Sequence, residues 1–274
     1  MEMHGKTALI TGSTDGVGRY VATRLASSGA KVLIHGRDRA RAMALADQIK
    51  GEGRGEAIFY QADLSSLSGA RQLADAVKAD HKRLDLFISN AGIGSQPGPE
   101  RHISKDGYEL RFAVNYLSGF LLAHLLLPLL KASVPSRIVN VASIGQQPID
   151  FDDVMITRGY SGTRAYCQSK LAQIMFTIDL AEVLSGSGVT VNSLHPATYM
   201  NTTMVRQGGI TPMSTVEEGG EAILRLAVGD DVAGKSGLFF NGMREAKANP
   251  QAYDQDARQR LRRLSLELTG LSAA

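Results

Sequence analysis

The sequence predicts an α/β protein in which a doubly wound parallel sheet of about seven strands carries helices on both faces. Short apolar runs of strand length alternate with segments whose apolar residues recur at helical spacing, as is typical of parallel sheets covered on both sides. A glycine-rich turn joins the first apolar run to the first helical segment. The 274 residues contain no repeat, low-complexity tract or clear linker, so residues 1–274 are predicted to form a single domain.

The first strand and the first helix are joined by Thr11-Gly-Ser-Thr-Asp-Gly-Val-Gly-Arg19. We predict a buried strand at residues 7–10 and a helix over 20–28, where apolar residues fall four apart. Backbone N–H groups at such a helix start can hold a pyrophosphate. The expected contacts are Gly12, Ser13, Thr14, Asp15, Gly16, Val17 and Gly18. One alternative is a turn without a ligand. Another is a triphosphate loop, which fits worse because Val17-Gly18 stands where Lys and Ser or Thr are required.

The remaining elements follow in order along the chain. Further strands are predicted at residues 31–35, 57–60, 84–89, 137–142, 189–194 and 237–240, and helices at 39–50, 68–81, 105–131 and 163–184. Gly29 is placed to end the first helix and Asp38 to cap the second. Residues 250–270 are predicted to form a helical tail, in which 258–263 are expected to be a solvated basic face.

The residues that follow each predicted strand are expected to form the binding edge. In a sheet of this kind, ligands bind outside the carboxyl ends of the strands, where the strand order reverses. Glycine-rich, polar or otherwise unusual residues stand at those points: Gly12 to Gly18, Gly36 and Arg37, Asp63 and Leu64, Asn90 to Gly92, Ser143, His195 and Pro196. The functional site is therefore predicted along this edge.

The end of the second predicted strand indicates which cofactor binds. A carboxylate about 20 residues past the glycines would bind a ribose 2′-hydroxyl, whereas an arginine would meet a 2′-phosphate. The sequence there is His35-Gly-Arg-Asp38, with no carboxylate at the strand end and Arg37 next. This pattern favours NADP(H) over NAD(H). The alternative is that Arg37 is a solvated surface residue.

A tyrosine and a lysine one helical turn apart are the candidate chemical groups. Tyr166 and Lys170 share a face of the predicted helix at 163–184, at the start of an otherwise apolar stripe. An ammonium beside a phenol lowers the pKa of the phenol from about 10, so that it can exchange a proton with a carbonyl or alcohol oxygen. Ser143, just after a strand, adds a hydroxyl that could hold the same oxygen. The alternatives are that Tyr166 and Lys170 are paired by chance and that Ser143 is only a turn residue.

Composition limits the other classes of function. A net charge of +3 and a pI near 9.0 suit a phosphate-rich ligand but do not indicate nucleic acid. The single cysteine, Cys167, cannot form an internal disulfide, which favours a cytoplasmic setting. The most apolar run, residues 117–130, is too short to span a bilayer and is expected to be a buried helix. The histidines show no metal-ligand spacing, so no metal is expected.

Taken together, these residues resemble the short-chain dehydrogenase/reductase family. The matching residues occur in register: Thr11-Gly-x3-Gly-x-Gly18, Asn90-Ala-Gly92, Asn115, Ser143 and Tyr166-x3-Lys170. The likeness covers nearly the whole chain, and residues 114–122, 165–171 and 261–271 are similar to the retinol-dehydrogenase-like branch. The resemblance implies a Rossmann-type fold of the ordinary, non-extended kind.

The resemblance also implies a role for each matching residue. Ser143 would steady the substrate oxygen, and Tyr166 would act as the acid/base. Lys170 would bind the nicotinamide ribose and lower the tyrosine pKa, and Asn115 would hold a water for proton relay. Arg37 matches members that prefer NADP(H). The cofactor would also be lined by Asp63, Leu64, Asn90, Ala91, Gly92, Pro196 and Thr198.

The predicted function is an NADP(H)-dependent oxidoreductase that acts on a hydrophobic carbonyl or alcohol. The alternative is a non-catalytic NADP(H)-binding sensor or scaffold of the same fold. Residues 145–164 are predicted to form a substrate-side loop with Gly159 and Gly162 as hinges, or else a surface excursion that touches no substrate. No nucleic acid and no membrane span are expected, and a homo-oligomer is left open.

Overall fold

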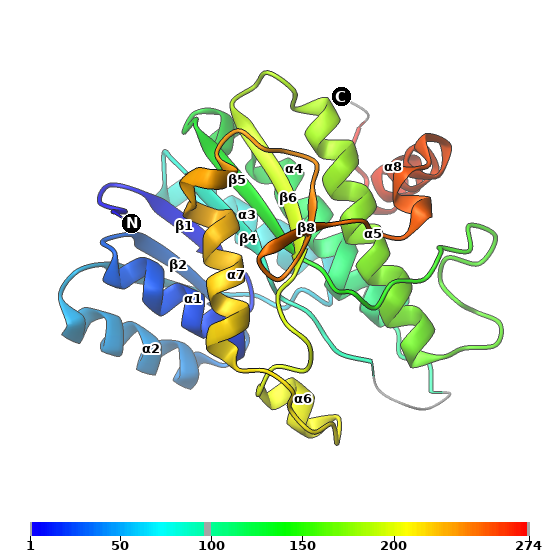
Figure 1. Ribbon diagram of the computed structural model, residues 1–274, viewed down its shortest axis with the longest axis horizontal. Coiled ribbons are helices and arrows are strands. Elements are labelled where there is room, and N and C mark those ends of the chain that lie inside the picture. The colour runs from blue at the N-terminus through cyan, green and yellow to red at the C-terminus, as the bar shows by residue number, and fades with distance from the viewer. Residues whose placement is uncertain (1, 96–99, 273–274) are drawn as a thin grey trace.

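The computed structural model describes residues 2–95 and 100–272 and contains one eight-stranded sheet in the order β3-β2-β1-β4-β5-β6-β7-β8 (Figure 1). The strands from β1 to β7 run parallel, and β8 is antiparallel to β7. The strands are β1 (Thr7–Ile10), β2 (Lys31–Gly36), β3 (Glu56–Gln61), β4 (Leu86–Ser89), β5 (Ser136–Val141), β6 (Val189–His195), β7 (Phe239–Asn241) and β8 (Arg244–Ala246). The predicted α/β fold is confirmed.

Helices cover both faces of the sheet, and each face has its own apolar core (Figure 1). One face is covered by α1 (Gly16–Ser27), α2 (Arg39–Glu52) and α7 (Val216–Val228). The other is covered by α3 (Leu67–Asp80), α4 (Ser118–Lys131) and α5 (Gly162–Val183), with α8 (Gln255–Thr269) packed against α5. The short segments are η1 (Phe112–Leu117), α6 (Thr203–Gln207), η2 (Asp230–Val232) and η3 (Pro250–Tyr253).

The strand order reverses between β1 and β4, and this reversal positions the site. β1 pairs with β2 on one side and with β4 on the other, Ile10 facing both Ile34 and Ile88. The loops that follow these strands therefore emerge side by side at the carboxyl edge. Asp38 caps α2 as predicted, because its carboxylate accepts a hydrogen bond from the backbone N–H of Arg41.

The predicted strand count of seven is one too low. The additional strand, β8, has three residues and pairs with β7 through a tight turn at Gly242 and Met243, where Gly242 has φ +57°. Its sequence, Arg-Glu-Ala, is too short and polar to show a strand pattern. The dipeptide Asn241-Gly242 is the hairpin signal that could have located it.

The helix predicted at residues 105–131 begins later than expected. Residues 105–109 form a turn and an isolated bridge, and helical backbone starts at Leu110. η1 is a wide π-helical turn that runs directly into α4. The segment Phe112–Lys131, at 20 residues, is therefore long and apolar enough to cross a membrane, contrary to the length expected from residues 117–130. Two thirds of the most apolar stretch of this segment is buried inside the fold.

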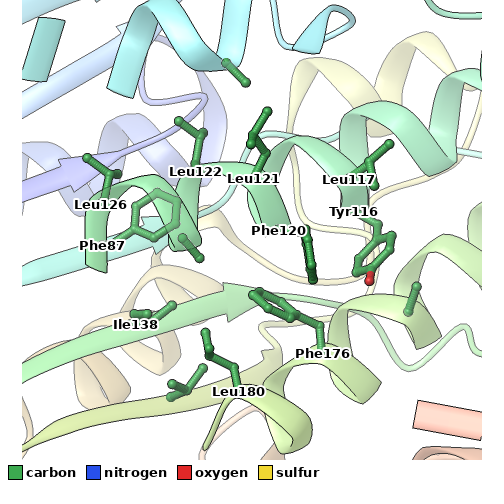
Figure 2. Close-up of a cluster of buried hydrophobic side chains, with 14 of the residues drawn as sticks. Phe87, Tyr116, Leu117, Phe120, Leu121, Leu122, Leu126, Ile138, Phe176 and Leu180 are labelled. Carbon is green, nitrogen blue, oxygen red and sulfur yellow. The ribbon is translucent and has the colours of Figure 1, made fainter. Parts of the chain in front are cut away.

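Figure 2 shows what buries that helix. The Tyr116 and Phe120 side chains point from η1 and α4 toward Phe176 of α5, in a cluster that also contains Phe87 and Ile138 of the sheet. The rings of Phe120 and Phe176 are 5.0 Å apart, within the range of favourable aromatic pairs. This apolar packing fixes α4 and α5, the two helices that carry or follow the predicted chemical residues.

The C-terminal helix α8 closes the outer side of α5. Its predicted solvated basic face is wrong at Arg258, which is buried and donates to Glu182 of α5 at 2.7 Å. Arg262 also pairs with the largely buried Asp179. Spacing alone did not show these partners, because both carboxylates lie on a helix about 80 residues earlier in the chain.

Candidate active site

The glycine loop at the start of α1 is packed tightly against the segment that follows β4. A methyl group on Gly12, which has φ +66°, would lie 2.9 Å from the Cα of Ala91, and one on Gly18 would lie 2.3 Å from the carbonyl oxygen of Gly12. The Asn90 amide donates to the carbonyls of Thr11, at 2.9 Å, and Gly12, at 3.1 Å. The structure thus brings together the predicted residues of the loop and Asn90 to Gly92.

His35 also holds this loop, and sequence reasoning did not assign it a role. Its Nδ1 accepts a hydrogen bond from the Gly12 N–H at 3.1 Å, so its Nε2 carries the proton and donates to the Ala62 carbonyl at 3.2 Å. Burial lowers the pKa of His35 to about 4. The neutral imidazole therefore ties β2 to the loops after β1 and β3.

The residues after β2 carry the predicted cofactor preference. A methyl group on Gly36 would lie 2.6 Å from the Thr14 side chain, so the end of the strand has no room for a carboxylate. Arg37 is exposed, and its carbonyl accepts a hydrogen bond from Gln61. A second cation that sequence reasoning missed, Arg41, forms an ion pair with Asp15 at 3.0 Å.

Two predicted residues already have structural partners. The Asp15 carboxylate caps α1 by accepting from the Gly16 N–H at 2.8 Å. Asp63 accepts from the N–H and hydroxyl of Ser65 and pairs with Lys105 at 2.9 Å, and these contacts outweigh desolvation and lower its pKa to about 2. Asp63 and the buried Leu64 lie at the end of β3, as predicted.

Asn115 lies in the π-helical turn η1 and is fully buried. Its Oδ1 accepts from the Ile93 N–H at 2.8 Å, while its Nδ2 donates to the Ile93 carbonyl and to the Ser169 hydroxyl. The side chain therefore clamps the segment after β4 to α5. π-Helical turns free a backbone carbonyl from its usual partner and often mark functional sites. The water expected at Asn115 stays a prediction.

Ser143 and Tyr166 lie next to each other at the carboxyl edge. Ser143 follows β5, and its buried hydroxyl accepts from the Gly145 N–H at 3.0 Å, which leaves its own proton for the Tyr166 oxygen or a bound substrate oxygen. A methyl group on Gly145 would lie 3.5 Å from the Ser143 hydroxyl and 3.6 Å from the Tyr166 ring. The backbone of Gly145, which has no side chain, therefore borders both the Ser143 hydroxyl and the Tyr166 ring.

The predicted lowering of the Tyr166 pKa by Lys170 is not found. Burial raises the pKa of Tyr166, and the hydrogen bond with Ser143 opposes that shift. The Lys170 ammonium lies 5.8 Å from the centre of the Tyr166 ring, and it donates instead to the Val141 carbonyl and the Gln173 side chain. Burial also lowers the pKa of Lys170 to about 7, so its charge is weakened near neutral pH.

The segment after β6 crosses the edge of the sheet above these groups. Pro196 is buried, and the Thr198 hydroxyl lies 3.1 Å from His195 Nε2. Further along, the Thr202 side chain lies over Gly16, where an added methyl would be 3.2 Å away. Met204 in α6 lies over Gly94, where a methyl group added to the glycine would be 3.3 Å from the Met204 side chain. The segment thus spans from the glycine loop to the residues after β4.

The loop at residues 145–161 is held on several sides. The Ile149 backbone exchanges two hydrogen bonds with the Gln251 side chain, and Phe151 lies under the Arg260 guanidinium at 4.7 Å from its ring centre. Gly159 has φ +57°, whereas Gly162 is already the first residue of α5. Phe151 thus faces α8. Throughout residues 2–95 and 100–272, no group of three or more metal-ligating side chains converges.

Comparisons with known proteins agree with this geometry. Residues 6–210 match the family model of the short chain dehydrogenases. Retinol dehydrogenase 13 of Homo sapiens is 38% identical over 288 residues, which cover 98% of this chain and 86% of that protein.

Two solved structures are similar over most of the fold. A protein of unknown function from Mycobacterium paratuberculosis superposes with a TM-score of 0.82 at 28% identity, covering 99% of this chain and 96% of the other. The complex of Pseudomonas aeruginosa RhlG with NADP superposes with a TM-score of 0.71 at 29% identity, covering 88% of this chain and 95% of the other.

Proposed function

The chain belongs to the short-chain dehydrogenase family, and from this premise we propose that it transfers a hydride between NADP(H) and a hydrophobic carbonyl or alcohol. The observation that carries the proposal is the meeting of Ser143, Tyr166 and Lys170 at the carboxyl edge, beside the glycine loop. Ser143 follows β5 and the other two lie on α5, and burial alone would not select three polar side chains there.

The side chains divide the proton chemistry among them. NADP(H), when bound, supplies or accepts the hydride. In the reducing direction, the Ser143 hydroxyl donates a hydrogen bond to the carbonyl oxygen, and the Tyr166 phenol gives that oxygen its proton. In the oxidising direction, Tyr166 takes the proton from the alcohol. Lys170 donates to the Val141 carbonyl and the Gln173 side chain, and in this scheme its remaining donor would bind the nicotinamide ribose.

The residues at the edge fit a phosphorylated dinucleotide. A methyl group on Gly92 would lie 3.6 Å from Lys170 Nζ and 3.3 Å from Asn115 Oδ1, so bare backbone leaves space in front of the ammonium for a ribose. The glycine loop and the start of α1 would hold the pyrophosphate. Gly36 bars a carboxylate, and Arg37 would meet the 2′-phosphate. The NADP complex of RhlG, a related fold, also supports this cofactor.

Apolar side chains around the hydroxyl pair support a hydrophobic substrate. Ile144, directly after Ser143, is 54% exposed, and Tyr199 and Met204 on the crossing segment are each 47% exposed. Exposed large apolar residues grouped at one edge indicate a surface that receives an apolar ligand. The relative named retinol dehydrogenase suggests an alcohol or aldehyde with a long apolar chain.

The test is turnover by the purified protein with NADPH or NADH and a series of aldehydes, ketones and alcohols of increasing apolar length. We expect NADPH oxidation with carbonyls, faster for apolar ones, and the reverse reaction with NADP⁺ and the matching alcohols. Tight NADPH binding without turnover on any compound would instead support the non-catalytic sensor or scaffold.

A further inference from the structure

Lys170 points its ammonium at two acceptors inside the protein. The residue is 6% exposed, and its Nζ donates at 2.9 Å to the Val141 carbonyl and at 2.9 Å to Gln173 Oε1. An ammonium has three N–H donors. Two of these donors are directed at Val141 and Gln173. The third is left for the side that Gly92 borders, where a methyl group added to Gly92 would lie 3.6 Å from Lys170 Nζ.

We propose that Gln173 is a positioning residue that fixes the Lys170 ammonium, keeps it charged, and aims its remaining donor at the bound cofactor. The proposal rests on the function proposed above, since that function places a ribose in front of Lys170. Gln173 does not itself touch substrate or cofactor in this scheme. It acts through Lys170, one helical turn earlier on the same face of α5.

The backbone that carries Gln173 is buried and tied to the sheet. Gln173 is 3% exposed, and its backbone carbonyl accepts a hydrogen bond from the Thr177 hydroxyl at 2.8 Å. That hydroxyl in turn accepts from the Asn140 amide of β5 at 2.9 Å. The helix turn that carries Gln173 is thus tied to β5, the strand that carries the other acceptor of Lys170, the Val141 carbonyl.

The surroundings of Lys170 explain why such an acceptor matters. Burial lowers the pKa of Lys170 to about 7. The titratable groups that face it are Tyr166 on α5 and His195 on β6, and the positive ammonium lowers the pKa of His195 further. η1 and β5 present the neutral Asn115 and the Val141 carbonyl. Gln173 Oε1 is therefore a neutral acceptor that favours the ammonium over the amine.

The direct experiment follows the titration of Lys170 by NMR of ¹³Cε-labelled lysine, with the signal assigned through Lys170→Met. Gln173→Leu removes the acceptor, so we expect the pKa of Lys170 to fall by about one unit. Gln173→Glu replaces it with a carboxylate and should raise that pKa. Gln173→Asn, which keeps an amide, provides a second neutral variant if the leucine variant does not fold.

The matched control is Gln168→Leu. Gln168 lies on the same helix, is also nearly buried at 4%, and donates to the Pro148 carbonyl instead of touching Lys170. The Gln168→Leu variant should therefore leave the pKa of Lys170 at its wild-type value. The inference is overturned if Gln173→Leu and Gln173→Glu shift the titration in the same direction or not at all, or if Gln168→Leu shifts it equally.

A second readout connects the titration to the cofactor. NADPH affinity, measured by fluorescence between pH 6 and 9, should weaken at a lower pH in Gln173→Leu than in the wild type, and at a higher pH in Gln173→Glu. If the pH dependence of NADPH affinity were the same in the wild type and both variants, Gln173 would not direct the third donor of Lys170 toward the cofactor. Because the NMR titration needs neither cofactor nor turnover, failure of the proposed function is distinguishable from failure of this inference.

Discussion

Gly36 and Arg37 show how two neighbouring residues could set a cofactor preference. Any side chain at position 36 would displace Thr14, because even a methyl would lie 2.6 Å from it. A ribose-binding carboxylate is thereby kept away from the end of β2, while the exposed guanidinium of Arg37 remains available. In the proposed preference for NADP(H), Gly36 therefore matters as much as Arg37.

Arg37→Ala should raise the KM for NADPH roughly tenfold to a hundredfold and leave the KM for NADH nearly unchanged. A hydrogen bond to a charged group contributes about 1.5–3 kcal/mol net. Steady-state kinetics with each cofactor measure the effect. Arg39→Ala, which removes another exposed arginine two residues later, is the control. Equal losses with both cofactors would show that Arg37 supports the loop and does not bind the phosphate.

His35 is a buried histidine whose neutrality the fold requires. Its Nδ1 must accept from Gly12, and protonation would turn that acceptor into a donor facing a donor. Its folded pKa of about 4 lies below the ordinary value of 6.5. Its contribution to stability is therefore complete above pH 6.5 and is lost as the pH falls from 6.5 toward 4.

We expect the free energy of unfolding to fall by about 2 kcal/mol between pH 7.5 and pH 5 because of His35 alone. His195, whose pKa burial also lowers to about 4, should contribute a similar loss. Denaturant unfolding at the two pH values measures the change. A His35→Gln variant should lose about half of this pH dependence. A wild type equally stable at both pH values would contradict the neutral-imidazole account.

At the scale of elements, the loop at residues 145–161 is anchored by a buried polar cluster. The Tyr160 hydroxyl donates to Glu109 at 3.0 Å and accepts from Arg111 at 2.7 Å, and Arg111 also donates to the Gly94 carbonyl. Glu109 and Arg111 are almost completely buried. Desolvation and Glu109 raise the pKa of Tyr160 to about 12. The loop is therefore tied to the helix of Asn115, which favours a fixed wall over a swinging lid.

Tyr160→Phe should cost about 1–3 kcal/mol of unfolding free energy, because it leaves a buried ion pair without its bridging hydroxyl. Tyr108→Phe is the comparison, since its hydroxyl makes one hydrogen bond to the Leu268 carbonyl at 3.1 Å, and it should cost less. Denaturant unfolding of both variants decides. The anchoring account fails if Tyr160→Phe is as stable as the wild type.

Element by element, the sequence pattern was informative where burial dominates. The apolar runs at β1, β5 and β6 are buried along almost their whole length and were placed within a residue. The pattern was least informative where a contact distant in sequence decides. The bridge at residues 103 and 109 delays the start of the helix, and the partner of Arg258 lies on another helix.

For the whole molecule, the sequence predicted which residues the sheet brings to one edge but not how these residues interact. Parallel strands put residues that follow them on one edge, so Ser143 and the glycine loop could be placed together. Hydrogen bonds across the core could not be predicted. The links from His35 to Gly12 and from Asn115 to Ile93 join residues more than 20 positions apart, which no local pattern records. Gln173 lies within one turn of Lys170, but its apolar surroundings gave no signal.

The most direct test of the central claim is Tyr166→Phe, measured for both turnover and NADPH binding. The variant removes only the phenolic hydroxyl and leaves the ring in place. Since general acid/base catalysis contributes about 10²- to 10⁴-fold, kcat should fall by that factor while the NADPH Kd stays near the wild-type value. A variant that keeps more than about half of the wild-type kcat would show that Tyr166 is not the acid.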